Sequence, residues 1–291
     1  MAHTTPLTVL CIASYFKGVD FLRECKRRGC RVFLLTSRKL DQEPWPWESI
    51  DEVFYMDAPD EDWDMQHLIA GVSHLARKEQ IDRIVPLDDF DLEKAAALRE
   101  HLRIPGMGDT RTRYFRDKLA MRGRAQEAGL PVPDFVHLLN EQRIREFMER
   151  VPPPWIIKPR SQASAVGITR VHSPEEVWNT MDKLGDRFSH YLMEKFLPGD
   201  VFHVDSVVYE RRVVFARAHR YMTPPWSVTH EGGIFRTHTL EYGSPEEQEL
   251  LRLNDQLITA FGLLRGVSHT EFIRSDEDGQ FYFLETSARV G

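Results

Sequence analysis

The chain has 291 residues, of which 42% are hydrophobic and 29% are charged. This composition is typical of a soluble globular protein with room for two or three compact units. The formal net charge of -7 argues against general binding to nucleic acid or to anionic membranes. Three cysteines without framework spacing favour a reducing cytoplasm, and no apolar segment is long enough to span a bilayer. The composition therefore predicts a cytoplasmic protein with neither nucleic acid nor membrane as partner.

The first third of the chain alternates between strand and helix patterns. Strand patterns cover residues 7–14, 31–36 and 83–87, and helix patterns cover residues 20–28 and 65–79. This alternation predicts a parallel, doubly wound α/β sheet. The turn after the first strand holds a single glycine, and no G-x-x-x-x-G-K-[ST] pattern is present. A dinucleotide-binding dehydrogenase or a P-loop enzyme is therefore not favoured.

The pattern changes near residues 104–108, which predicts a domain boundary there. We expect an α/β domain over residues 1–108, followed by two lobes over residues 109–190 and 191–291. A helix is expected from Asp109 or Thr110 to Gly129. Further strands are expected at residues 155–158, 167–171, 191–196, 201–209, 213–217, 270–273 and 281–285, and helices at 141–149, 174–183 and 245–261.

Two lysines are candidates for phosphate binding. Lys118 lies in Arg116-Asp117-Lys118, and Lys158 ends the apolar strand Trp155-Ile156-Ile157. Each lysine alone is most often a solvated surface cation. Lys158 is the better candidate, because three apolar neighbours favour a cleft, where a phosphate could compensate its charge. Small residues at 161–168 could present backbone N–H groups to the same phosphates, with an ordinary hairpin loop as the alternative.

Two glutamates interrupt apolar strands near the end of the sequence. Glu271 lies in His-Thr-Glu-Phe-Ile and Glu285 in Phe-Tyr-Phe-Leu-Glu, and residues 275–279 form a turn pattern between them. The two strands should therefore pair antiparallel. Neighbouring buried carboxylates repel each other unless divalent cations bind to both. The pattern predicts a metal site, with two half-exposed surface glutamates as the alternative.

These features, in their order along the chain, resemble the ATP-grasp ligases with their preceding α/β domain. Residues 193–200 (MEKFLPGD) and 283–291 (FLETSARVG) add to the resemblance, which covers essentially the whole chain. It is nearest to members similar to L-amino acid ligases. The resemblance implies an α/β protein in which an N-terminal parallel-sheet domain precedes a two-lobed α+β ATP-grasp domain.

The resemblance also implies a set of nucleotide contacts. Lys118 and Lys158 would hold the ATP phosphates, with Lys158 also catalytic, and Glu194 would accept from the adenine amino group. Asp200 occupies the position of a ribose-binding acid. The backbone of Lys195, Phe196 and Leu197 would contact the adenine edge. The loop over the phosphates would be formed by Ser161, Gln162, Ala163, Ser164 and Gly167.

Magnesium ions, with manganese as an alternative, would be held by Glu271 and Glu285. Ser287 stands where many members have an asparagine ligand, and it is included as a weaker third ligand. Arg289 would act catalytically by stabilising an acyl phosphate, since its guanidinium stays ionised and offers two parallel donors. Most relatives continue beyond this motif, so a truncated form or the ordered part of a longer protein is expected.

The predicted activity is an ADP-forming, ATP- and Mg²⁺-dependent ligation of a small-molecule carboxylate to an amine or a thiol. Two alternatives stay open, namely a non-catalytic ATP-binding regulator or scaffold and a kinase-like phosphotransferase. The loss of the usual asparagine and the glycine-poor loop favour the first alternative. The oligomeric state also stays open, with a homodimer as one candidate.

The segment over residues 217–239 is the candidate acceptor site. Arg220 could bind a carboxylate and Trp226 could pack on an apolar side chain, with an exposed surface hairpin as the alternative. Twelve histidines are present, but no H-E-x-x-H or C-x-x-C motif occurs, so a zinc site is not expected. A G-x-S-x-G elbow is also absent, which argues against a serine hydrolase.

Overall fold

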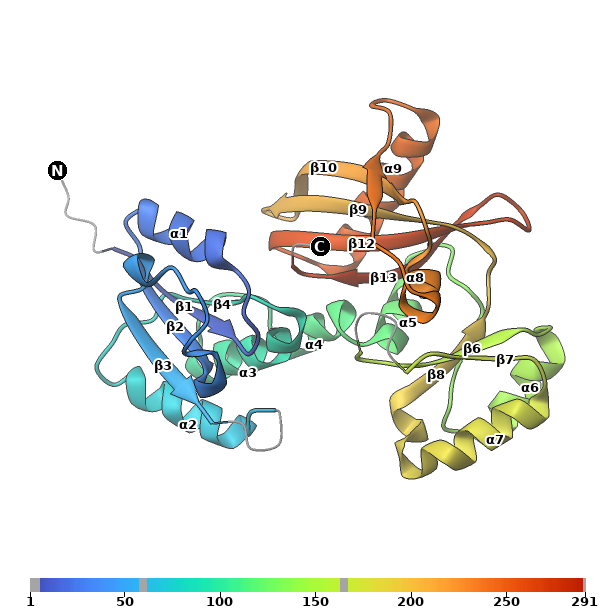
Figure 1. Cartoon of the computed structure of the whole chain (residues 1–291), viewed down its shortest axis with the longest axis horizontal. Coiled ribbons are helices and arrows are strands. Elements are labelled where there is room, and N and C mark those ends of the chain that lie inside the picture. Colours follow the sequence, from blue (N-terminus) through green and yellow to red (C-terminus); the bar gives the residue numbers. More distant parts are fainter. Residues whose placement is uncertain (1–5, 58–61, 163–166, 290–291) are drawn as a thin grey trace. The chain divides into compact units, whose positions relative to one another are not determined.

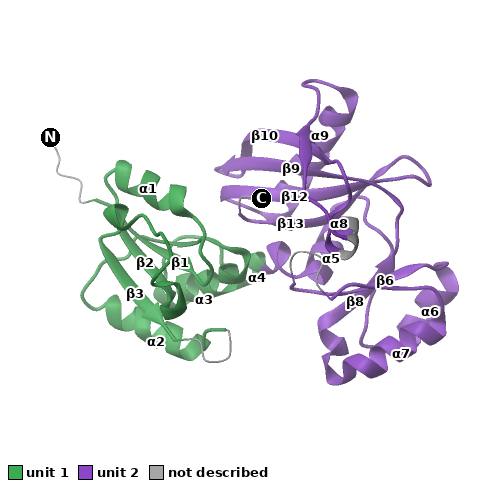
Figure 2. Cartoon of the chain, viewed as in Figure 1, with its two compact units in different colours: residues 1–112 green, residues 113–291 purple. Residues whose placement is uncertain are grey.

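The structure is a computed structural model that describes residues 6–57, 62–162 and 167–289. It divides into two compact units, residues 1–112 and residues 113–291, which Figure 2 colours separately. The division falls after Thr112, whereas the sequence pattern placed a boundary after Gly108. Ala163 and Ser164 of the expected phosphate loop lie outside the described residues.

The first unit contains the expected parallel sheet. Its strands are β1 (Thr8–Ala13), β2 (Arg31–Ser37), β3 (Glu52–Met56) and β4 (Arg83–Pro86), in the order β3-β2-β1-β4. The helices are α1 (Val19–Arg27), α2 (Met65–Leu75), α3 (Leu92–Leu102) and the short α4 (Asp109–Thr112) (Figure 1).

Both faces of this sheet are buried, which explains the continuous apolar runs in its strands. Along β1, Leu10 and Ile12 belong to one hydrophobic cluster, while Val9 and Cys11 belong to another. Successive side chains of a strand point to opposite faces, so the two clusters cover the two sides of the sheet. The expected doubly wound arrangement is thereby confirmed for this unit.

The single helix expected from Asp109 to Gly129 is wrong. Helix α4 ends at Thr112, a 3₁₀ turn covers Arg113–Phe115, and a separate helix α5 covers Lys118–Glu127. Asp117 has an extended backbone, and its carboxylate accepts from the backbone N–H groups of Leu119 and Ala120 at 2.9 and 3.4 Å. Because this side chain satisfies donors that a continuous helix would pair internally, a new helix begins at Lys118.

The second unit contains two antiparallel sheets. The smaller sheet has the order β5-β8-β6-β7, built from β5 (Phe135–His137), β6 (Trp155–Pro159), β7 (Thr169–Val171) and β8 (Tyr191–Lys195). Helices α6 (Glu141–Arg150) and α7 (Pro174–Leu184) share one hydrophobic cluster with it, in which Trp155 and Phe147 are buried. The sequence predicted all these elements except the three-residue strand β5.

The larger sheet has five strands in the order β11-β10-β9-β12-β13 (Figure 1). They are β9 (Gly199–Tyr209), β10 (Arg212–Tyr221), β11 (Thr237–Thr239), β12 (Arg265–Ser275) and β13 (Phe281–Ser287). The long helix α9 (Pro245–Phe261) contacts β9 and β10, and Phe261 packs edge-on against Phe283 of β13. A short helix α8 covers Pro225–Glu231.

Strands β9 to β13 carry polar side chains on the face opposite their buried phenylalanines. Phe202 and Phe272 are fully buried, whereas their neighbours His203 and Glu271 point to the other face. Glu271 and Glu285, the two candidate metal ligands, lie on that polar face. Among the described residues, no helix is long and apolar enough to cross a membrane.

Candidate functional site

A buried ion-pair network joins the small sheet to helix α5. Lys158 on β6 donates to Oε1 of Glu194 on β8, and Arg122 on α5 donates from Nε and Nη2 to Oε2 of Glu194 at 3.1 and 3.0 Å. Arg122 also donates to the carbonyl oxygen of Leu284 on β13. The three charged side chains are at most 8% exposed. Two buried cations thus share one buried carboxylate.

The pKa values of Lys158 and Glu194 both lie below their ordinary values, for different reasons. Burial lowers the pKa of Lys158 to about 8, with Glu194 opposing the shift and Arg122 and Lys118 adding to it. Burial acts to raise the pKa of Glu194, but Arg122 and Lys158 outweigh it, so that pKa is lowered. An added anion would compensate the second cation and relieve the unfavourable burial of Lys158.

The start of α5 brings Lys118 to the second glutamate of the candidate metal pair. Lys118 Nζ lies 2.8 Å from Glu285 Oε2 and donates to the carbonyl oxygen of Gln162 at 2.6 Å. Arg116 donates to the carbonyl oxygen of Ser161 at 2.8 Å. The two segments that sequence analysis linked to phosphate binding, residues 116–118 and 161–162, are therefore in direct contact.

Strands β12 and β13 pair antiparallel, as the sequence predicted, and their register places Glu271 directly opposite Glu285. Tyr221 of β10 donates to Glu271 Oε1 at 2.9 Å. Burial acts to raise the pKa of Glu285, but Lys118, Lys158 and Arg122 together lower it to about 2. Two adjacent carboxylates, one of them held ionised at neutral pH, form an oxygen donor set that fits Mg²⁺. Ser287, on the same strand as Glu285, is paired with His269 of β12.

The segment expected to bind adenine lies at the end of β8. The backbone N–H groups of Lys195 and Phe196 donate to the carbonyl oxygens of Asp134 and Pro154 at 2.8 and 3.1 Å. These two N–H groups are engaged within the protein, so adenine recognition would have to use other backbone atoms here. Leu197 is buried against the apolar cluster that contains Val201 and Ile273.

Asp200, the candidate ribose-binding acid, is paired with two arginines. Its Oδ2 lies 2.7 Å from Arg220 Nη2 and 3.4 Å from Arg274 Nη2. Arg220, the candidate acceptor residue, thus has an acidic partner, and its side chain stays 38% exposed. Arg289 lies two residues beyond the end of β13, and Gly167 has a φ of +73° just before β7.

The sequence analysis missed Arg122, although a signal was available. Arg122 lies four residues after Lys118 on the same helix, and residues at this spacing share one face of a helix. It also missed the polar side chains around Asp205 on β9. These come from three strands, so no local motif marks them.

The architecture, in which a parallel α/β domain precedes a unit with two antiparallel sheets, is similar in fold to solved ATP-grasp ligases. The L-amino acid ligase from Bacillus licheniformis matches over 99% of this chain and 68% of its own, with a TM-score of 0.78 and 20% identity. An N5-carboxyaminoimidazole synthetase from Staphylococcus aureus, complexed with ADP, matches over 99% of this chain and 72% of its own, with a TM-score of 0.73 and 17% identity.

Sequence comparison also finds ligases among the similar proteins. Residues 125–223 match the family model described as D-ala D-ala ligase C-terminus. The L-arginine-specific L-amino acid ligase of Bacillus subtilis is 26% identical over 216 residues, which cover 72% of this chain and 52% of that protein. The D-alanine–D-alanine ligase of Verminephrobacter eiseniae is 25% identical over 183 residues, covering 60% and 55%, respectively. The chain is thus similar in sequence and in fold to ATP-grasp ligases, as the resemblance implied. It spans about half the length of these two curated relatives.

Proposed function

We propose that this chain binds ATP with Mg²⁺ and uses it to join a small-molecule carboxylate to an amine or a thiol, releasing ADP and phosphate. The contact between Lys118 and Glu285 carries the proposal. It brings a cation suited to phosphate within 2.8 Å of a carboxylate suited to a metal ion, which is the pairing that a metal–nucleotide complex requires.

The chain's own residues have separate roles in this proposal. Lys118 and Lys158 hold the phosphates, and the loop predicted over residues 161–168, of which 163–166 lie outside the described residues, is the candidate cover for them. Arg122 positions Glu194, which accepts from the adenine amino group with the lone pairs that its two ion pairs leave available. The adenine edge is read by backbone atoms of Lys195, Phe196 and Leu197, and Asp200 binds the ribose.

Glu271 and Glu285, with Ser287 as a weaker ligand, would hold Mg²⁺, which supplies charge neutralisation at the phosphates when bound. A carboxylate oxygen of the substrate bonds to the γ-phosphorus as the bond to ADP breaks. The amine nitrogen or thiol sulfur then bonds to the acyl carbon, phosphate leaves, and the nucleophile gives up its proton. Arg289 stabilises the negative charge on the acyl phosphate.

Amino acids are the first substrate class to test. The two curated relatives are named as ligases of L-amino acids and of D-alanine, and the family model carries the same chemistry in its description. The proposal includes a cytoplasmic location, where ATP and free amino acids meet. We also propose that the protein forms a homodimer, which a measurement of its molecular mass in solution would test.

The experiment is to incubate the natural protein with ATP, Mg²⁺ and pools of amino acids and other carboxylates, and to measure ADP, phosphate and the coupled product. The proposal expects release that requires Mg²⁺ and one pool and that is lost in Lys158→Ala and Glu285→Ala. Lys183→Ala, at an exposed lysine near the end of α7, is the control and should keep full activity.

Two other outcomes would replace the proposal with its alternatives. ATP binding without turnover under every pool would favour a non-catalytic ATP-binding regulator. A stable phosphorylated substrate without a coupled product would favour a phosphotransferase. Either result can be recognised by mass spectrometry of the same reaction mixtures.

A further inference from the structure

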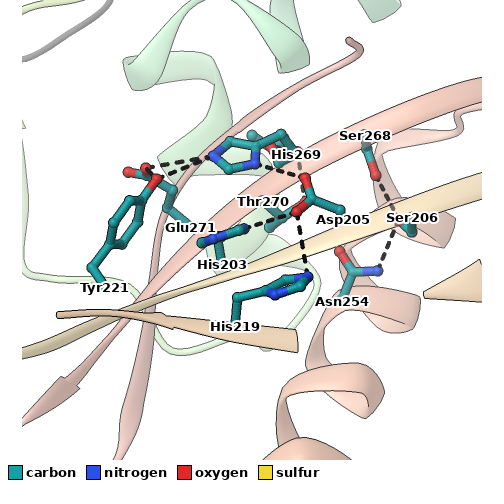
Figure 3. A network of polar contacts seen from close by, with 11 residues as sticks. His203, Asp205, Ser206, His219, Tyr221, Asn254, Ser268, His269, Thr270 and Glu271 are labelled. Carbon is teal, nitrogen blue, oxygen red and sulfur yellow. Dashed lines mark hydrogen bonds and ion pairs between the residues drawn. The ribbon is translucent and has the colours of Figure 1, made fainter. Parts of the chain in front are cut away.

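The polar face of the five-stranded sheet gathers imidazoles around one carboxylate. His203 and Asp205 lie on β9, His219 on β10 and His269 on β12. The strand register pairs His219 with His203 and His269 with Asp205 directly across the sheet. Figure 3 shows the carboxylate of Asp205 at the centre of the three rings. Adjacent antiparallel strands thus place four potential metal ligands on one face.

The distances around Asp205 are those of a compact ligand set. His203 Nδ1 lies 2.9 Å from Oδ2 of Asp205, and His269 Nδ1 lies 2.8 Å from Oδ1. His219 Nε2 is 3.7 Å from Oδ2. Ligand atoms of His203, Asp205 and His269 all lie within 4.8 Å of one another. Two imidazole N–H protons therefore bridge to the carboxylate at positions where a divalent cation could replace them.

Burial and ring contacts hold the imidazole of His203 in a fixed orientation. His203 is 7% exposed, and within the described part of the chain its Nε2 is buried without a hydrogen-bond partner. Its ring is fixed by stacking on His219, with ring centres 4.7 Å apart, and by contact with Tyr221 at 4.9 Å. Nε2 is the other ring nitrogen from the Nδ1 that faces Asp205, so it stays outside the ligand set and can carry the ring proton when Nδ1 binds a cation.

We propose that His203, Asp205 and His269 form a binding site for a transition-metal dication of the zinc class, with His219 as a fourth ligand. Two or three imidazoles with one carboxylate suit Zn²⁺, whereas Mg²⁺ prefers an all-oxygen set such as Glu271 and Glu285. When a cation binds through Nδ1 the ring proton resides on Nε2, so a neutral imidazole changes tautomer and only a charged imidazolium releases a proton. The side chain of Asp205 is 38% exposed, so the site is open to water or to a substrate atom on one side.

A hydrogen-bonding partner on the far side of His269 supports the site. His269 Nε2 lies 3.6 Å from Glu271 Oε1 and 3.5 Å from the hydroxyl oxygen of Tyr221. A histidine ligand commonly has its other nitrogen oriented by a carboxylate in this way. The absence of an H-E-x-x-H or C-x-x-C motif does not bear on this site, because its ligands come from three strands rather than from one helix or loop.

The test is a zinc titration of the chelator-treated protein against a chromophoric chelator, with excess Mg²⁺ present to occupy the all-oxygen site. We expect one tightly bound equivalent of Zn²⁺. Asp205→Asn and His269→Asn should each weaken zinc binding by at least about 100-fold. His238→Asn, on β11 of the same sheet and exposed, should bind zinc like the natural protein. Substituted Co²⁺ should give a visible absorption spectrum that both site variants lose.

Failure of the site to bind zinc overturns this inference, and so does unchanged zinc affinity in both site variants. Circular dichroism and the unfolding temperature of each variant show whether a loss of binding reflects unfolding. His203→Gln, which keeps one polar group at the buried position, serves as a third variant if Asp205→Asn fails to fold. The titration contains no ATP and no substrate, so its outcome is separate from that of the proposed ligase function.

Discussion

The two sheets of the second unit handle buried charge in opposite ways. On the small sheet and α5, two cations, Lys158 and Arg122, share the single carboxylate of Glu194. On the large sheet, carboxylates and imidazoles dominate, and Glu271 directly faces Glu285. An excess of buried cations favours an anion such as phosphate, whereas paired carboxylates favour a metal ion. In the proposed function, the cation-rich network would bind the phosphates and the paired carboxylates would bind the metal ion of one metal–nucleotide complex.

Removing a carboxylate from the large sheet should have the largest effect on activity. Glu285→Gln keeps the shape of the side chain but removes the charge that pairs with Lys118 and would hold Mg²⁺. We expect the rate of ADP formation to fall by about 1,000-fold, with a higher Mg²⁺ requirement. Initial rates across a Mg²⁺ titration measure both quantities.

The control for this change is Glu277→Gln. Glu277 is a half-exposed turn residue paired with Lys195, so its loss should leave the rate within about twofold. If Glu285→Gln keeps wild-type rates and Mg²⁺ dependence, the large sheet is not the metal half of the site, and the contrast between the sheets loses its functional meaning.

Removing Arg122, the cation that helix α5 contributes to the buried network, should act first on the stability of the protein. Arg122→Met leaves Glu194 with Lys158 alone and leaves the carbonyl oxygen of Leu284 without this donor. Breaking a buried ion pair on one side costs about 3 kcal/mol of unfolding free energy. Urea unfolding followed by circular dichroism measures the loss.

The matched surface change is Arg252→Met, which removes an exposed pair with Glu249 on α9. It should cost less than about 1 kcal/mol. Equal losses for the two variants would contradict the view that the small sheet depends on a balanced buried network.

The anion-binding half should respond to pH through Lys158. Its pKa is lowered to about 8, chiefly by burial, so the cationic form predominates below that pH and is lost as the pH rises through it. Only the cation attracts phosphate, so the Kd of a non-hydrolysable ATP analogue should rise by about tenfold between pH 7 and pH 9. Isothermal titration calorimetry at a series of pH values measures the profile.

Lys158→Arg provides the comparison, because a guanidinium stays ionised over this range. Its binding profile should be flat where that of the natural protein rises. An equally steep profile in both proteins would assign the pH dependence to another group and remove Lys158 from phosphate binding.

The sequence predicted the structural features that depend on local residue pattern and on the order of motifs along the chain. Strands β1, β2 and β4 of the parallel sheet, helix α9 and the antiparallel pairing of β12 with β13 follow from periodicity, caps and one turn signal, whereas strand β3 was not predicted. Short elements such as β5 and β11, with three residues each, carry too little pattern to detect. The break before Lys118 depended on one capping carboxylate, which competed with a pattern that suited a continuous helix.

The partners of each candidate residue could not be predicted, because they come from distant parts of the chain. Lys158 and Glu194 are adjacent only because β6 pairs with β8, and Arg122 reaches them from α5. The three histidines around Asp205 meet only because β9 lies between β10 and β12. Register between strands, rather than composition, decides which charges are compensated.

The smallest expected effect concerns Arg220, near the end of strand β10 in the large sheet. Arg220 and Arg274 both pair with Asp200, but only Arg220 lies in the candidate acceptor segment, residues 217–239. We expect Arg220→Ala to raise the KM for the acid by about fivefold, since half-exposed charge pairs contribute about 1 kcal/mol at most. Arg274→Ala should leave that KM unchanged while removing the same kind of contact to Asp200. Steady-state kinetics with the acid varied at saturating ATP separates the two. Parallel changes in the KM for ATP alone, in both variants, would mean that Arg220 serves Asp200 and that the acid binds elsewhere.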